Sequence, residues 1–205
     1  ASSIVGSTVI NVGAGDWTLY CKEDTLTVPV SDLVLQVTGD GLTHVHEWSK
    51  QPIGEMSLYN QSQSYGTSPN LIKVPAVRPN STQTSFNSFL NGASRFNDPS
   101  ISEWNMSGVT NLVGFFGYCT VFDQSLANWD TSEVLYMTDM FRGAKAFNQP
   151  LDTWDVSKVR NMSGLFRETN LFNQPLDSWN TGSATNMEYM FAETMSFNQP
   201  LDNWD

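Results

Sequence analysis

The sequence predicts an α+β protein, in which a small antiparallel β region is followed by a solenoid of 25-residue coils. The first observation is a tandem repeat, since tryptophans recur every 25 residues at Trp104, Trp129, Trp154, Trp179 and Trp204. The second is a set of short β-branched runs near the N-terminal end. A fixed period of this length is typical of stacked repeats, which bury their apolar side chains against their neighbours.

Residues 1–48 are expected to form the antiparallel β region. They contain short apolar runs such as STVINV and LVLQV, separated by turn residues, and a Gly-Asp-Gly turn at 39–41. His44 and His46 would share one face of a strand, which allows a metal site, but no third ligand is in view and ordinary surface histidines are favoured. Cys21 and Cys119 lie in different halves of the chain and predict two buried thiols.

Residues 49–84 are interpreted as a polar connection and a degenerate cap, and residues 85–205 as the tandem-repeat solenoid. The segment 49–70 is rich in Ser, Gln, Asn, Gly and Pro, which is typical of an irregular loop. A degenerate first repeat suits a cap because its outer face is exposed to solvent and does not pack against another coil. Within each repeat, a short strand is expected four to eight residues after the tryptophan, and about two helical turns after that.

The apolar positions of the repeat predict its core. Each repeat carries a tryptophan and two phenylalanines at fixed positions, and one repeat alone cannot bury them. The predicted core therefore includes the five tryptophans together with Phe116, Phe141, Phe166, Phe191, Phe122, Phe147, Phe172 and Phe197.

Polar residues also recur in rows. An amide ladder is predicted from Asn148, Asn173, Asn198, Gln124, Gln149, Gln174 and Gln199. Such a ladder would satisfy backbone groups of neighbouring coils, although a repetitive polar face could instead bind a repetitive partner. Carboxylates also form two rows, which are expected to cap backbone amides and face solvent, with calcium as the alternative. The first row contains Asp130, Asp155 and Asp205, with Asn180 interrupting it, and the second contains Asp152, Asp177 and Asp202. Sequons occur at Asn60, Asn80, Asn105 and Asn161; the last two are better explained by the repeat pattern.

Composition and charge limit the function. The net charge of −11 disfavours nucleic-acid binding, and no apolar run is long enough to span a membrane. The repeat supplies identical residues in rows, whereas acid-base or nucleophilic catalysis needs a convergent cluster of unlike residues. No enzyme activity, catalytic residue, cofactor or resident metal is therefore predicted.

The segment FNQPLDTWDVSKVRNMSGLF at 147–166 closely resembles the repeat of the BspA-like bacterial surface proteins. The resemblance covers residues 85–205, with departures at Tyr136, Gly182 and Phe96. It implies a leucine-rich-repeat-like solenoid that is extracellular or exposed on a cell or particle surface, as an adhesin, lipoprotein or secreted protein.

The predicted function is thus a non-enzymatic, surface-exposed interaction or adhesion module that binds a protein or polysaccharide partner. The alternative is a structural subunit of a virion or extracellular filament, whose N-terminal region docks to the assembly. The last repeat copy, 197–205, is expected to leave an apolar end that more chain, a partner or another copy covers. An appended carbohydrate-binding domain of an enzyme is a third interpretation.

Overall fold

The computed structural model describes residues 70–78 and 81–204, together with the backbone of five strands nearer the N-terminal end. The five strands are β1 (Thr8–Asn11), β2 (Gly15–Trp17), β3 (Val34–Thr38), β4 (Leu42–Val45) and β5 (Glu55–Ser57). A single 3-10 helix, η3 (Pro99–Glu103), follows them within the described residues. His46, Cys21, Asn60, Asn80 and most of the predicted polar connection lie outside the described residues.

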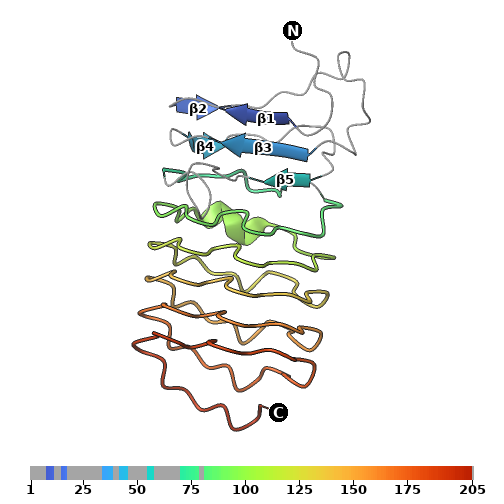
Figure 1. Ribbon diagram of the computed structural model, residues 1–205, viewed down its shortest axis with the longest axis vertical. Helices are drawn as coiled ribbons and strands as arrows, with labels where there is room; N and C mark the ends of the chain where they lie inside the picture. Colours follow the sequence, from blue (N-terminus) through green and yellow to red (C-terminus); the bar gives the residue numbers. More distant parts are fainter. Residues whose placement is uncertain are drawn as a thin grey trace.

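The N-terminal strands pair in parallel, so the predicted antiparallel region is wrong. One set runs in the order β1-β3-β5 and the other pairs β2 with β4. Thr8 of β1 lies beside Leu35 of β3, and Val34 of β3 lies beside Glu55 of β5. These strands lie at the N-terminal end of a stack of coils (Figure 1). The alternating apolar pattern predicts strands but is the same for both pairing directions, which explains the error.

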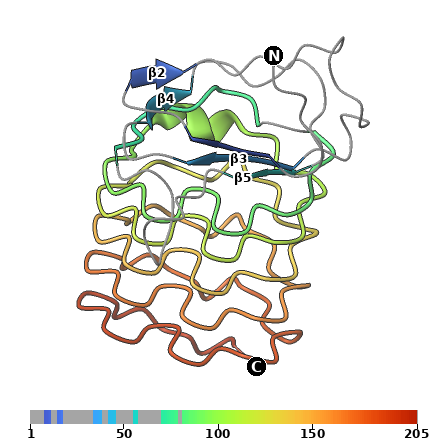
Figure 2. The same ribbon diagram turned by 45° about the horizontal axis from the view of Figure 1, so that its top comes forward.

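The chain then returns to the same lateral position once per repeat. Isolated parallel bridges connect Ser85 to Asn111, and then Asn111, Tyr136, Asn161 and Asn186 in succession. Figure 2 shows the resulting coils one above the other. We define coils 1 to 4 as residues 104–128, 129–153, 154–178 and 179–203, each beginning at a tryptophan.

The coils contain turns in place of the predicted helical segments, so the α+β assignment is wrong as well. In coil 2, the N–H groups of Met137, Asp139 and Phe141 donate to carbonyls of coil 3. The N–H groups of Met140 and Arg142 donate instead to residues three positions earlier in their own coil. Because alternate N–H groups donate to carbonyls of the next coil, they are not available for the hydrogen bonds of a continuous helix. The 3, 3, 1 spacing of apolar residues reflects successive tight turns.

The core is a set of aromatic columns that run along the stack. Phe122, Phe147 and Phe172 stack with centroid separations of 5.8 and 5.9 Å and interplanar angles of 7° and 6°. The phenylalanines at 116, 141, 166 and 191 form a second column, with separations of 5.6 to 5.8 Å. These rings are buried in coils 1 to 3, so burial of apolar area between neighbours stabilises each coil.

Each tryptophan also fixes the register between coils. The indole Nε1 of Trp154 donates to the Leu126 carbonyl at 3.1 Å, and that of Trp179 donates to the Leu151 carbonyl at 2.9 Å. Trp154 and Trp179 are 4 and 2% exposed. A slip of one residue would leave a buried indole N–H without an acceptor, which the low dielectric of the core makes costly.

Candidate functional site

The residues predicted as repeat core lie inside the stack. Trp104, Trp129, Trp154 and Trp179 are buried, as are the paired phenylalanines of coils 1 to 3. Their equivalents in the last described turn, Phe191, Phe197 and Trp204, are partly buried and pack against the same core. None of these residues offers a polar group to a ligand, because each indole N–H already bonds a backbone carbonyl.

The residues predicted as an amide ladder form hydrogen bonds between coils. The side-chain oxygen of Asn148 accepts from the backbone N–H of Asn173 at 2.9 Å and from Gln174 Nε2 at 3.0 Å. Asn173 accepts in the same way from Asn198 and Gln199 at 2.9 and 3.1 Å. The same pattern begins earlier in the chain. Asn97 accepts from the backbone N–H of Asp123 and from the Gln124 side chain. Asp123 accepts in turn from the backbone N–H of Asn148 and from the Gln149 side chain. These amides therefore form their hydrogen bonds with neighbouring coils.

One carboxylate row caps turns. Asp155 Oδ1 accepts from Ser157 N–H at 2.9 Å, and Asp130 Oδ1 accepts from Ser132 N–H at 3.1 Å. Hydrogen bonds from these serines hold the pKa of both carboxyls below the ordinary value. Asn180 makes the equivalent bond in coil 4. No group of three or more His, Cys, Asp or Glu side chains within the described residues is arranged to hold a metal ion.

The buried thiol has a structural environment. Cys119 Sγ donates to the Leu90 carbonyl, and burial raises the pKa of this thiol well above its ordinary value. A buried thiol with a raised pKa is unreactive because the thiolate is the nucleophile.

A row of charged and aromatic side chains crosses several coils and is the strongest candidate site. We define the Arg–Glu–Tyr strip as Tyr118, Arg142, Arg167, Glu168, Tyr189 and Glu193. These residues come from four successive coils, so the strip extends along the stack axis.

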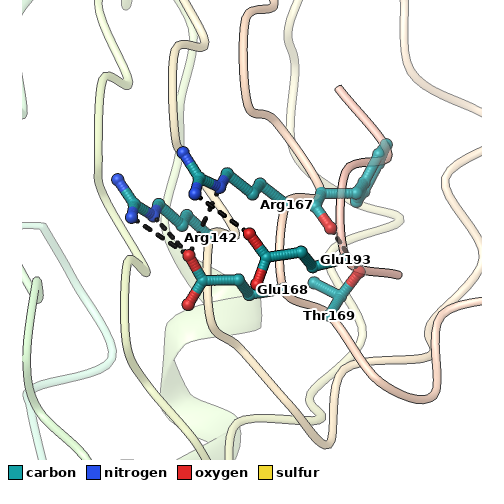
Figure 3. A network of polar contacts seen from close by, with 6 residues as sticks. Arg142, Arg167, Glu168, Thr169 and Glu193 are labelled. Carbon is teal, nitrogen blue, oxygen red and sulfur yellow. Dashed lines mark hydrogen bonds and ion pairs between the residues drawn. The ribbon is translucent and has the colours of Figure 1, made fainter. Parts of the chain in front are cut away.

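Ion pairs hold the centre of the strip. Glu168 Oε1 lies 3.0 Å from Arg142 Nη2 and 3.3 Å from Arg167 Nε, and Arg167 Nη2 lies 3.0 Å from Glu193 Oε1. Figure 3 shows the two arginines extending in the same direction, with the carboxylates facing their guanidinium groups. The side chains are 25 to 65% exposed. Ion pairs this exposed contribute little stability, so packing alone gives a weak account of the row.

Aromatic rings flank the ion pairs. The Arg142 guanidinium lies 5.4 Å from the centroid of the Tyr118 ring, and that of Arg167 lies 5.9 Å from the centroid of the Tyr189 ring. Tyr189 is 68% exposed. Each arginine is therefore restrained by a carboxylate and a ring together.

A shallow hollow of about 160 Å³ lies beside the strip. Asp139, Ser163 and Glu188 line it together with Arg142, Arg167, Gly164 and Tyr189. Partial burial raises the pKa of the Asp139 carboxyl, against the opposing effect of the two guanidinium groups. The arrangement presents fixed hydrogen-bond donors and acceptors along an aromatic-flanked surface, which suits recognition of a polar partner.

Sequence reasoning missed the strip, although a signal was present. Arg142 and Arg167 occupy the same position of successive repeats, as do Glu168 and Glu193. The signal was weak because the other coils carry Gly117 and Ala192 where the arginines stand.

A comparison with known protein families gives a match over most of the repeat region. The family model described as "Mycoplasma protein of unknown function, DUF285" matches residues 84–204, more than half of the 205 residues. No curated protein and no solved structure matches the chain. No helix in the described part of the chain is long and apolar enough to cross a bilayer.

Proposed function

Because the chain belongs to the DUF285 family of Mycoplasma proteins of unknown function, and because it carries an ordered polar strip across four coils, we propose that it is a non-enzymatic interaction module. It acts on an exposed surface and binds a protein partner through the Arg–Glu–Tyr strip. The strip is the observation that carries the proposal. The ladders and aromatic columns beside it serve the stack itself.

The composition of the strip supports a protein partner. Arginine and tyrosine are enriched among the residues that contribute most to protein–protein binding. The ion pair between Arg142 and Glu168, and the stacking of Arg167 on Tyr189, restrain side chains before a partner arrives. Restrained side chains lose less entropy on binding, so more of the contact energy appears as affinity.

The surface location rests on the resemblance to the BspA-like repeats. Extended repeat stacks suit binding because they present a long face with fixed spacing. The net charge of −11 adds solubility and favours a partner with basic groups.

A structural subunit of a virion or extracellular filament is the second candidate. The observation that favours it is the exposure of apolar side chains in coil 4. Met195 is 81% exposed, and Tyr189 is 68% exposed. A neighbouring subunit on this face would remove that apolar surface from water.

Binding of the labelled chain to a panel of immobilised extracellular-matrix proteins and to a glycan array tests the first candidate. The strip variant is Arg142→Ala with Tyr189→Ala, and the matched control is Asp152→Ala with Asp177→Ala, on exposed residues of another row. We expect a protein ligand whose affinity falls about tenfold or more in the strip variant, as for substitution of a binding hot spot, and is unchanged in the control.

Equal losses in both variants, or binding to glycans alone, would count against a protein partner at the strip. Light scattering of the purified chain provides the second arm. Absence of any ligand combined with concentration-dependent assembly would favour the structural subunit, because burial of coil 4 would then drive association.

A further inference from the structure

In every coil, the tenth and the fourteenth residues after the tryptophan lie in the left-handed backbone region. In coil 1 these are Gly114 and Tyr118, and in coil 2 they are Asp139 and Gly143. Their φ values lie between 52° and 68°. The remaining members are Ser88 and Gly92 before coil 1, Gly164 and Glu168 in coil 3, and Tyr189 and Glu193 in coil 4.

Glycine alternates with side-chain-bearing residues along these rows. The first row reads Ser, Gly, Asp, Gly, Tyr, and the second reads Gly, Tyr, Gly, Glu, Glu. A left-handed conformation costs a residue other than glycine about 1–2 kcal/mol. If backbone geometry alone decided the sequence, glycine would be favoured in every coil. The alternation therefore has another cause.

The cause is contact between successive coils. A Cβ atom added to Gly143 would lie 2.7 Å from Cδ1 of the Tyr118 ring in coil 1. A Cβ atom added to Gly164 would lie 2.2 Å from Asp139 Oδ1 in coil 2. The Tyr118 and Asp139 side chains thus occupy the space left by the glycine of the next coil, and a side chain in place of Gly143 or Gly164 would collide with them.

The one break in the alternation has its own compensation. Glu168 and Glu193 follow each other in the second row, so two like charges occupy neighbouring coils. Arg167 contacts both carboxylates, at 3.3 and 3.0 Å. A guanidinium group between them offsets the repulsion that the pair would otherwise feel.

We propose that the coils recognise their neighbours by type, and that the structural unit of this stack is a pair of coils. Coils 1 and 3 are of one type, with glycine at the first left-handed position and a side chain at the second, and coil 2 is of the other type, with the reverse. Coil 4 carries side chains at both positions, and Arg167 compensates its second one. A coil stacks well on a neighbour of the opposite type and poorly on one of its own type. The residues at these two left-handed positions therefore determine which coils can be neighbours in the stack.

Insertion of coils into the full chain tests this pairing. A same-type insertion duplicates residues 104–128, which places a second Tyr118 against the first. A paired insertion duplicates residues 104–153 and keeps the alternation. A relieved insertion also duplicates 104–128, with Tyr118→Gly in the first copy, and differs from the same-type insertion by that one residue. Urea unfolding followed by tryptophan fluorescence compares all three with the parent chain.

We expect the paired insertion to raise the urea midpoint, because added compatible coils bury more core. The same-type insertion should lower it, with an unfolding equilibrium constant about tenfold or more above that of the relieved insertion, the size expected for overpacking. A same-type insertion as stable as the relieved one would overturn the proposal. If the same-type chain does not fold, a paired or relieved insertion less stable than the parent would equally overturn it.

Discussion

Replacement of Gly143 by alanine offers a direct measure of the contact between coils 1 and 2. The change adds one methyl group at a φ of 68°, and this group would lie 2.7 Å from the Tyr118 ring. The left-handed backbone contributes about 1–2 kcal/mol of destabilisation. Displacing a ring that also stacks on Arg142 contributes about 1–3 kcal/mol, the usual cost of overpacking. We expect a total loss of about 2–5 kcal/mol in the free energy of unfolding.

Gly108 supplies the matched control. It also has a positive φ, of 77°, but a Cβ atom added there would meet no other atom within 4 Å. Gly108→Ala should therefore show the backbone cost alone, about 1–2 kcal/mol. Urea unfolding of the two variants and the parent, followed by tryptophan fluorescence and circular dichroism, gives the comparison.

A third variant separates the contact from the backbone. Tyr118→Ala in the Gly143→Ala background removes the ring, so the double variant should be more stable than the sum of the two single changes predicts. Equal losses of stability for Gly143→Ala and Gly108→Ala, or strict additivity in the double variant, would refute the view that the Tyr118 ring requires glycine at position 143.

Three further predictions concern the polar rows, each checked by urea unfolding at controlled pH. Asn148→Ala should cost about 1–3 kcal/mol, because two donors of the next coil lose their acceptor; Asn148→Asp should cost less, since Asp123 accepts in the same way. Asp155→Ala should destabilise the chain at neutral pH, and Asp155→Asn should destabilise it less, because Asn180 makes the equivalent hydrogen bond. Because the folded pKa of Asp155 is lowered, its contribution is lost as pH falls below about 4 through that pKa. The folded pKa of Asp139 is raised, so Asp139→Asn should stabilise the chain at neutral pH, and the gain should vanish below about pH 4.

The period and the inward positions could be predicted from the sequence because they depend on the spacing of the apolar residues along the chain. A tryptophan and two phenylalanines at a fixed interval cannot be buried within one repeat, which points to stacking. The amide rows were predictable for a related reason. Asn and Gln carry donors and acceptors together, so repeated amides are suited to bonds between equivalent positions such as Asn148 and Asn173.

Backbone direction could not be predicted in the same way. Side chains alternate between the two faces in parallel and antiparallel strands alike, so the sequence pattern does not indicate that β1 pairs with β3 in parallel. The helical prediction failed because spacings of three residues fit both a helix and a series of turns. The left-handed residues, such as Asp139 and Glu168, and the hydrogen bonds between coils distinguish the two, and both are properties of the folded stack.

Repeat positions that carry the same residue in every coil and positions where the residue differs play different roles in this chain. Trp154, Asn148 and their equivalents recur because every coil must meet its neighbours in the same way. At the position of Arg142 the coils differ, since Gly117 and Ala192 also occur there. A Cβ atom added to Gly117 would lie 2.5 Å from Asn91 Nδ2, so stacking favours glycine in coil 1, whereas Arg142 and Arg167 pair with glutamates of the next coil. The partner that we propose should therefore be sought at the Arg–Glu–Tyr strip, where the residues differ from coil to coil.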